Sequence, residues 1–126
     1  EPVVRESVTR LVLQPNGDAG KLRAGLVGLG WGIVDERLLI EGRYVYPTIV
    51  AEKIGVTPGY VVEDLVFGPV LRRERSAVFV EMLERKAAYL RRVLGQCGSD
   101  VEATVRFQAE LAMVEGELAC GEHPAL

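Results

Sequence analysis

The side chains that most often perform acid-base, nucleophilic or metal chemistry are few in this sequence. It contains a single histidine, His123, and two cysteines, Cys97 and Cys120. A Ser-His-Asp triad needs a histidine beside a nucleophile, and a zinc site needs several histidines or thiolates held together. We therefore expect neither a triad nor a bound metal. The cysteines flank a predicted helical hairpin that would allow a disulfide, but two free thiols are the preferred interpretation.

A series of glycines, Gly25, Gly28, Gly30 and Gly32, contains a G-x-G-x-G pattern that suggests a nucleotide-binding loop. A loop that cradles phosphate follows a strand and opens a helix, so that the helix amides face the anion. Here the glycines lie within and after a predicted helix and continue into a predicted strand, which is the reverse order. We interpret Gly25 and Gly28 as sites of close helix-to-sheet packing and Gly30 as the glycine that ends the helix.

Charge is distributed unevenly along the chain, although the net charge is only −3. Residues 1–62 carry seven acids and seven bases, residues 63–99 five acids and seven bases, and residues 100–126 six acids and one base. The arginines of the middle segment are Arg72, Arg73, Arg75, Arg85, Arg91 and Arg92. Such a set could neutralise nucleic-acid phosphates, which would make affinity fall with salt. The alternative is a helical face that is merely solvated.

The hydrophobic pattern predicts the elements that must position these residues. Their expected order is strand, helix, strand, strand, over residues 8–13, 18–30, 33–40 and 44–51. Asp18 is available as the N-cap of the helix. Pro47 weakens the last strand, because proline cannot donate a ladder hydrogen bond and fits best at a bulge or an unpaired position.

The pattern changes to two amphipathic helices after the middle of the chain. Ser76 is expected to cap the first helix, and Ser99 with Glu102 forms a capping-box pattern at the start of the second. Two such helices joined by a few residues predict an αα-hairpin. We therefore divide the chain into an α/β part, residues 1–62, and a helical part, residues 63–126.

The composition, with 48% apolar and 26% charged residues in a chain of 126, is typical of one soluble globular domain. No run of about eighteen uncharged apolar residues predicts a membrane span, and no leader is recognisable, so a cytoplasmic protein is expected. The sequence opens with Glu1 directly before a predicted strand. We therefore expect it to be part of a longer polypeptide.

Residues 51–65 allow a competing interpretation as a helix-turn-helix. Ala51, Gly55 and Val61 resemble its spacing of a small residue, a turn glycine and an apolar residue. Against it, a second glycine lies where the recognition helix should form, and Lys53 is the only basic residue in the window. A helix-turn-helix DNA-binding protein and a non-catalytic helical interaction domain remain the alternatives to the function considered next.

Four sequence blocks in a fixed order carry a resemblance to a known family. They are RLVLQPN at 10–16, GWGIVDE at 30–36, YPTIVAEK at 46–53 and LVFGPVL at 65–71, followed by the long helical hairpin. This arrangement is similar to the TrmK family of bacterial tRNA (adenine-N1) methyltransferases. The similarity extends to about Leu94, and the ordered set is more specific than any single block.

The resemblance implies an α/β fold: the C-terminal half of a Rossmann-like, class I methyltransferase sheet that ends in an antiparallel strand pair, then a coiled-coil-like helical hairpin that helps to hold tRNA. It implies S-adenosylmethionine as the methyl donor and tRNA as the substrate. The family's glycine-rich donor-binding strand, acidic ribose ligand and second glycine-rich loop would all precede the first block. We therefore expect a missing N-terminal half to be this chain's partner and to bind most of the donor, and the isolated chain to be inactive.

The chemistry that the resemblance implies needs alignment more than a general base, because adenine N1 is already a nucleophile near neutral pH. Gln14 and Asn16, with Pro15 between them, follow a predicted central strand at the end where ligands collect in open α/β sheets. Their amides could orient the base, or the tripeptide could simply form the turn before the helix. Tyr46 could stack on a base or pack in the core.

Overall fold

The computed structural model of the protein describes residues 9–56 and 58–121. It divides into two compact units, of which the first ends at Glu74 and the second begins at Arg75. The functional boundary that the sequence suggests after residue 62 stays a prediction.

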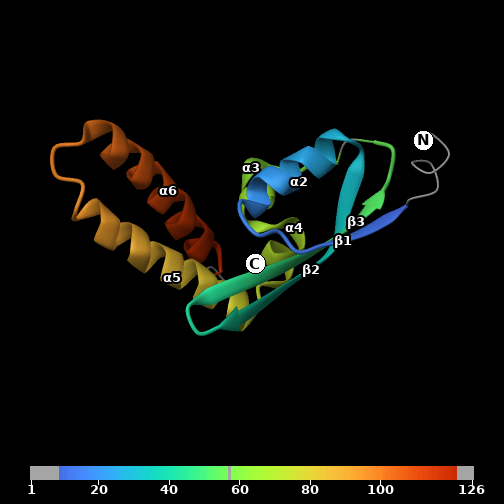
Figure 1. The fold of residues 1–126 in the computed structure, drawn as a ribbon, viewed down its shortest axis with the longest axis horizontal. Coiled ribbons are helices and arrows are strands. Elements are labelled where there is room, and N and C mark those ends of the chain that lie inside the picture. The colour runs from blue at the N-terminus through green and yellow to red at the C-terminus, as the bar shows by residue number, and fades with distance from the viewer. Residues whose placement is uncertain (1–8, 57, 122–126) are drawn as a thin grey trace. The chain divides into compact units, whose positions relative to one another are not determined.

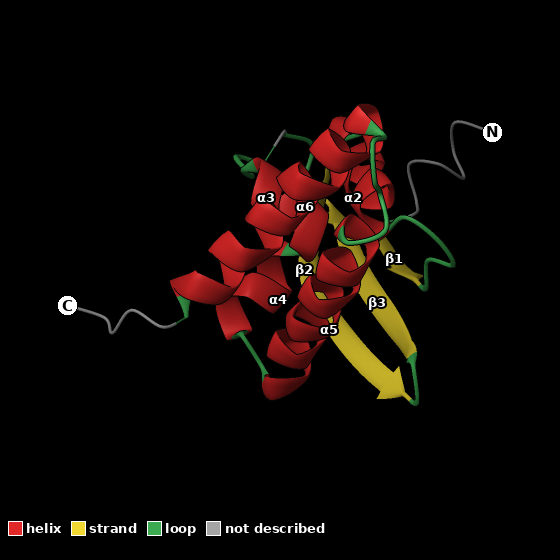
Figure 2. Ribbon diagram, turned by 90° about the vertical axis from the view of Figure 1, so that its left-hand side faces the viewer, coloured by secondary structure: helices red, strands yellow, loops and turns green. Residues whose placement is uncertain are grey.

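The first unit is an α/β structure with the predicted order of strand, helix, strand, strand. Its elements are β1 (Arg10–Leu13), α2 (Ala19–Gly28), β2 (Trp31–Glu41), β3 (Tyr44–Lys53), α3 (Val62–Phe67) and α4 (Pro69–Glu74). The helices α2, α3 and α4 lie on the same face of the sheet (Figures 1 and 2). Among the described residues of this unit, no helix lies over the other face of the sheet.

The three strands form one sheet in the order β1-β3-β2, and both pairings are antiparallel. Ile49 lies opposite Leu13 of β1 and opposite Glu36 of β2, so it sits at the centre of the sheet and is fully buried. Because both outer strands are antiparallel to β3, they run parallel to each other, and α2 is the crossover between them. The antiparallel strand pair after a strand-helix unit is the arrangement that the resemblance implies.

Pro47 is tolerated in the central strand because only one neighbour pairs with it. The pairing with β1 reaches no further than Ile49, whereas Pro47 faces Leu38 of β2. On the β1 side, Pro47 has no ladder partner among the described residues. The register irregularity between β2 and β3 lies elsewhere, between Ile33 and Asp35. The proline therefore lies where β3 is unpaired on its β1 side, and not at a bulge.

The ends of α2 are those that the sequence predicts. The Oδ1 atom of Asp18 accepts a hydrogen bond from the backbone N–H of Lys21 at 3.1 Å, which makes Asp18 the N-cap. Gly30 follows the C-cap residue Leu29 and has a φ of +88°. Glycine adopts this left-handed conformation without steric cost, so Gly30 ends the helix and lets the chain enter β2.

The interpretation of Gly25 and Gly28 as close-packing sites is wrong. Both are exposed, and a Cβ built at either position would have no other atom within 4 Å. The close approach occurs instead at Gly20, where a Cβ would lie 3.4 Å from the carbonyl oxygen of Leu65. The small residue therefore permits contact between α2 and α3, not between α2 and the sheet.

The helix-turn-helix interpretation is also wrong. β3 continues as far as Lys53, so the residues expected in the first helix of that motif are in a strand. The next helix, α3, begins only at Val62 and has six residues. The described residues of this window therefore lack the first of the two helices that the motif needs.

The core of the first unit lies between the sheet and the helices. Its buried apolar residues are Leu26, Ile33, Ile49, Ala51 and Val70. Trp31 and Tyr60 pack at its margin, and the Tyr60 hydroxyl oxygen accepts a hydrogen bond from the backbone N–H of Ile33 at 3.1 Å. The sheet, α2 and α4 are thus held together by contacts among these side chains.

The second unit consists of two long helices, α5 (Ala77–Leu94) and α6 (Val101–Cys120). They pack against each other through a stripe of α5 formed by Phe79, Leu83, Ala87 and Leu90, all of which are buried, as is Val114 of α6. Despite their length, neither these helices nor any other in the described part of the chain is apolar enough to cross a membrane.

The caps of the two helices agree with the predictions in one case and differ in the other. Ser76 caps α5, with its hydroxyl oxygen accepting a hydrogen bond from the N–H of Phe79 at 3.2 Å. The N-cap of α6 is Asp100, whose Oδ1 accepts from the N–H of Ala103 at 3.0 Å, and not the predicted Ser99. Both residue types are good caps, so local sequence cannot choose between neighbours.

Cys97 and Cys120 are free thiols. Cys97 lies in the turn after α5, whereas Cys120 is the last residue of α6, which has 20 residues. At about 1.5 Å per residue, the length of α6 separates them by roughly 30 Å. A disulfide needs Cα atoms about 4.4–6.8 Å apart, so these two cysteines cannot pair within the chain.

Candidate functional site

The predicted substrate-positioning tripeptide, Gln14-Pro15-Asn16, directly follows the last residue of β1. Both amide side chains are exposed, and neither is hydrogen-bonded to another described residue. The capping of α2 falls to Asp18 and not to Asn16. The tripeptide does form the turn from the strand into the helix, but its amides remain available to a ligand.

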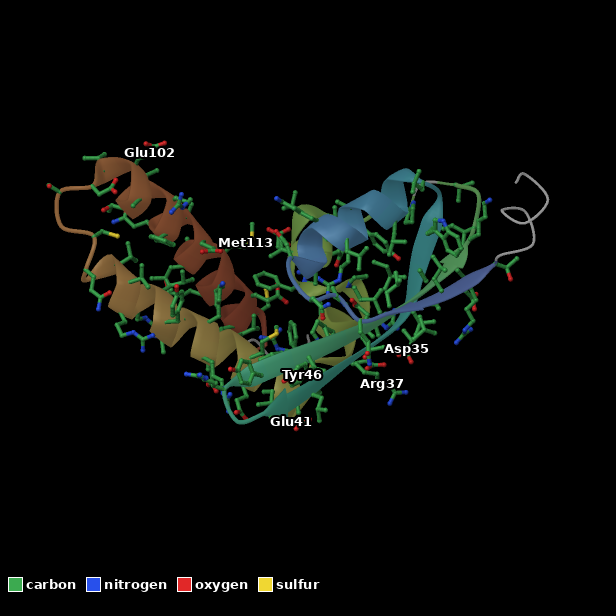
Figure 3. All side chains as sticks on the ribbon, in the orientation of Figure 1. Asp35, Arg37, Glu41, Tyr46, Glu102 and Met113 are labelled. Carbon is green, nitrogen blue, oxygen red and sulfur yellow. The ribbon has the colours of Figure 1, made fainter. Side chains whose placement is uncertain are left out.

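Tyr46 lies on β3, the strand that pairs with β1. The pairing of the two strands ends where Leu13 is opposite Ile49, and Tyr46 lies three residues before Ile49. The Tyr46 side chain is 50% exposed, and strand alternation puts it on the sheet face opposite to Ile49. The alternative of core packing therefore does not describe Tyr46, and its ring is open to solvent (Figure 3).

Around Tyr46 the β2–β3 hairpin carries apolar and charged side chains on one face. Leu39 lies opposite Tyr46 in the ladder and is 55% exposed, and the ring centroids of Tyr44 and Tyr46 are 6.3 Å apart. Asp35 and Arg37 form an exposed ion pair, with 3.4 Å between Oδ2 and Nε. Two exposed aromatic rings on one strand suit stacking against a planar ligand such as a nucleobase.

Two of the six arginines expected to bind RNA have structural partners. Nη1 of Arg72 is 2.7 Å from Oδ1 of Asp64. Nη2 of Arg75 donates hydrogen bonds to the carbonyl oxygens of Glu117, at 2.6 Å, and Leu118, at 3.0 Å. Carbonyls in the last turn of a helix lack intrahelical donors and carry partial negative charge, so Arg75 satisfies the C-terminus of α6. Arg75 thus joins the start of α5 to the end of α6.

The other four arginines are exposed, on α4 and α5. Arg85 pairs with Glu81 one turn earlier at 2.5 Å, and Arg91 pairs with Glu115 of α6 at 2.8 Å. The guanidinium carbon of Arg92 lies 5.5 Å from the ring centroid of Tyr89. Arg73 makes no ion pair within the described residues. The six residues are therefore not one cluster: some hold the fold, and others face solvent.

A buried ion pair is the main polar feature that the sequence analysis missed. Nε of Arg23 donates to Oε2 of Glu36 at 2.7 Å, and the two side chains are only 3% and 0% exposed. Oε1 of Glu36 also accepts hydrogen bonds from the backbone N–H groups of Val70, at 2.9 Å, and Leu71, at 3.3 Å. The carboxylate therefore binds the first free N–H groups of α4, where an anion is favoured.

The arginine of this pair completes a link between two of the resemblance blocks. Nη1 of Arg23 donates to the carbonyl oxygens of Leu65 and Val66, both at 3.1 Å. Gly68, between α3 and α4, has a φ of +104°, and a Cβ there would lie 2.5 Å from Oε1 of Glu36. The block containing Glu36 and the block containing Gly68 are thus in direct contact. The sequence signal for this contact is a charged residue at a position where the helix or strand pattern predicts a buried side chain, as at Arg23 in α2 and Glu36 in β2.

The buried pair is structural, since its polar atoms bind groups of the fold. No buried side-chain nitrogen or oxygen in the described residues lacks a hydrogen-bond partner. Residues 9–56 and 58–121 also contain no group of three or more His, Cys, Asp or Glu side chains placed to hold a metal ion. The single histidine, His123, lies outside the described residues.

Comparison with known proteins identifies the relatives of this fold. The model of the TrmK family, described as tRNA (adenine(22)-N(1))-methyltransferase, matches residues 4–118. The comparison with curated proteins gave no match. Among solved structures, a proposed tRNA (m1A22) methyltransferase of Streptococcus pneumoniae is 32% identical with a TM-score of 0.80, over 88% of this chain and 50% of that chain.

Two further structures agree with this relationship. The S. pneumoniae protein in complex with S-adenosyl-L-methionine matches with 28% identity and a TM-score of 0.76, over 93% of this chain and 51% of that one. A Streptococcus agalactiae protein of the NADB-Rossmann superfamily is 25% identical with a TM-score of 0.83, over 94% and 51% of the two chains. This chain therefore spans about half the length of these solved proteins.

The relationship rests on nearly the whole chain, because the family model covers both the α/β unit and most of the α5–α6 unit. The four blocks noted in the sequence lie inside the matched residues. The chain belongs to the TrmK family of tRNA (adenine(22)-N(1))-methyltransferases.

Proposed function

We propose that this chain supplies the C-terminal half of an S-adenosylmethionine-dependent tRNA (adenine-N1) methyltransferase. The observation that carries the proposal is the match of the TrmK model to residues 4–118. The S. pneumoniae relative binds S-adenosyl-L-methionine, and this chain matches about half of it. On this proposal, the N-terminal half that the family resemblance requires binds the methyl donor, and the enzyme works in the cytoplasm.

The strand order supports a finer proposal for the fold. The order β1-β3-β2 suits the last part of a Rossmann-like class I methyltransferase sheet, in which a final antiparallel pair follows a strand-helix unit. β1 pairs only with β3 among the described residues, so its other edge is the place where the remaining sheet would join. Residues 1–62 then belong to the catalytic domain, and residues 63–126 form a helical hairpin domain that helps to hold tRNA.

The proposed role of Gln14, Asn16 and Tyr46 is to orient the target adenine. The donor supplies an electrophilic methyl group, and adenine N1 supplies the lone pair. The reaction therefore depends on holding the base in line, for which effective-molarity gains are large. Two exposed amides offer hydrogen bonds to the edge of the base, and an exposed ring offers a stacking surface. No side chain of this half acts as a general base on this proposal.

The proposed tRNA contacts are the exposed arginines of each unit, namely Arg73 of α4 in the first and Arg85, Arg91 and Arg92 of α5 in the second. Arg72 and Arg75 instead stabilise the fold, because their donors bind Asp64 and the end of α6. α6 is acidic by contrast, and its exposed carboxylates are Glu102, Glu110 and Glu115. Phosphates would be repelled from that side, so the backbone of tRNA is expected on the α5 side.

The test is methylation of an unmodified tRNA by the protein joined to its N-terminal half, with labelled donor. We expect methyl transfer to adenine N1, and a fall in kcat/KM of about ten- to a hundredfold when Gln14 and Asn16 are both replaced by alanine. Gln96→Ala is the matched control, because Gln96 is an exposed amide in the turn between the helices. Absence of transfer by the joined protein would favour the helical interaction domain instead, which predicts no salt-sensitive tRNA binding.

A further inference from the structure

Arg91 and Arg92 are adjacent, exposed residues of the same type on α5, but the structure gives them different partners. Nη2 of Arg91 lies 2.8 Å from Oε2 of Glu115 on α6. Arg92 instead lies over the Tyr89 ring, with 5.5 Å between its guanidinium carbon and the ring centroid, and it forms no ion pair within the described residues. A carboxylate offsets the charge of the first arginine, whereas the charge of the second is not offset.

Tyr89 is on the surface of α5 and does not contribute to the packing of the two helices. Its side chain is 46% exposed, whereas Phe79, Leu83 and Leu90 form the buried stripe. One turn before Tyr89, Nζ of Lys86 lies 5.9 Å from the ring centroid, and its contact with Glu110 is long, at 3.8 Å. An exposed aromatic residue thus has a cation one helical turn away on each side, where i and i±3 side chains meet.

The chemistry of this arrangement favours a phosphate ligand. An aromatic face attracts a guanidinium through its quadrupole, and an arginine held in this way keeps its N–H donors for a bidentate contact with a phosphate. Restricting the arginine beforehand also lowers the entropy lost on binding. Arg92 has no carboxylate partner among the described residues, so it is the cation suited to bind an anion.

We propose that Tyr89 and Arg92 form a phosphate-binding pair for the tRNA backbone. Arg92 makes the phosphate contact, and Tyr89 is a positioning residue that holds the guanidinium. This inference rests on the proposed function for the identity of the ligand. It goes further by assigning different roles to two neighbouring arginines and by adding an aromatic residue to the surface.

The experiment measures binding of unmodified tRNA to the 126-residue chain over a range of salt concentrations. R92A should weaken binding about three- to tenfold and reduce the slope of log affinity against log salt by about one. R91A should weaken binding less than R92A does, because Arg91 is already paired with Glu115. The matched control is R106A on the acidic helix α6, where Arg106 is exposed and lies 4.8 Å from the ring centroid of Phe107, and it should change the affinity less than twofold. Y89A should weaken binding about two- to fivefold, which is the range for an exposed cation-π contact, whereas Y89F should bind like the unchanged protein.

The double variant tests the positioning role directly. Adding Y89A to R92A should cause no further loss, because the tyrosine acts through the arginine. Additive losses, an R91A effect equal to that of R92A, or an unchanged affinity of R92A would each overturn the proposed pair. All of these side chains are exposed, so circular dichroism should show unchanged helix content in every variant.

The outcomes also separate this inference from the proposed function. If the unchanged chain binds tRNA and R92A binds equally well, only the Tyr89–Arg92 pair is overturned. If the unchanged chain does not bind tRNA even at low salt, the pair and the RNA-binding role of α5 both fail. Methyl transfer by the protein joined to its N-terminal half is measured separately and decides the activity.

Discussion

The two units of this protein use ion pairs in different environments. In the first unit, the side chains of Arg23 and Glu36 are 3% and 0% exposed, whereas those of Arg91 and Glu115 in the second are 57% and 47% exposed. A buried charge is costly unless its whole hydrogen-bonding capacity is used, and here the carboxylate also binds two backbone N–H groups. A surface pair is screened by water and contributes little.

The difference between the buried and the exposed ion pair indicates which charged residues of each unit can bind a ligand. The buried pair cannot exchange its partners without unfolding its surroundings, so its role is to hold the junction between α3 and α4. The association of α5 with α6 instead depends on apolar side chains such as Phe79, Leu83 and Val114. Surface arginines of the second unit can therefore exchange a carboxylate or solvent for a phosphate at little cost to the fold.

The largest effect is expected from Glu36→Ala. Removing the carboxylate leaves Arg23 charged and buried and leaves the N–H groups of Val70 and Leu71 without their acceptor, which should lower the free energy of unfolding by about 3–5 kcal/mol. Urea unfolding followed by the fluorescence of Trp31, the single tryptophan, reports on this unit.

Two controls sharpen this measurement. Glu36→Gln keeps one acceptor oxygen and loses the charge, so its cost should lie below that of the alanine variant. Glu81→Ala removes a half-exposed partner of Arg85 and should cost less than about 1 kcal/mol. A loss below 1 kcal/mol for Glu36→Ala would mean that burial does not distinguish the two kinds of pair.

The next largest loss of stability is expected from Gly68→Ala. The φ of +104° strains any side chain by about 1–3 kcal/mol, and the new Cβ would also press on Glu36. Gly25→Ala is the matched control, since Gly25 is exposed within α2 and has open space around it. It should stabilise the protein by about 0.5–1 kcal/mol. If both variants changed the free energy of unfolding in the same direction, Gly68 would not be required for its positive φ or for its contact with Glu36.

Local patterns predicted the elements because each depends on residues close in sequence. The sequence identified the caps Asp18 and Ser76 and the terminal Gly30. It also predicted the strand that contains Pro47, which the structure confirms. The same local reasoning was wrong by one residue at the start of α6. There, two adjacent residues are both good caps, and packing decides between them.

The partners of charged side chains could not be predicted, because they depend on the tertiary fold. Glu36 binds α4 residues 34 and 35 positions away, and Arg75 binds carbonyls 42 and 43 positions away. A cluster of arginines in the sequence therefore mixes residues that hold the structure with residues that face solvent. The exposed Gln14 and Asn16 were recognisable because a strand end is a local feature, and their proposed role in base orientation awaits the methylation test.

A smaller effect is expected from Arg75→Ala, which removes the side-chain donor to the carbonyls of Glu117 and Leu118 at the end of α6. The side chain is 21% exposed, so water can replace part of the interaction, and a loss of about 1–2 kcal/mol is expected. Hydrogen exchange of amides in the last turns of α6 measures it. Arg75→Lys keeps the charge with fewer donors and should recover about half of the loss. Unchanged hydrogen exchange in both variants would show that Arg75 does not stabilise the C-terminus of α6.

The smallest effect is expected from Glu115→Ala, which removes the exposed partner of Arg91. The free energy of unfolding should fall by about 0.2–1 kcal/mol, and the difference should vanish in 1 M salt, where the screening length is about 3 Å. The loss caused by Glu36→Ala should persist in the same salt, because solvent ions do not reach that pair. Thermal unfolding followed by circular dichroism at both salt concentrations makes the comparison. A salt-independent cost at Glu115 would show that the surface pair contributes to helix association, and Arg91 would then be no freer to bind phosphate than Arg23.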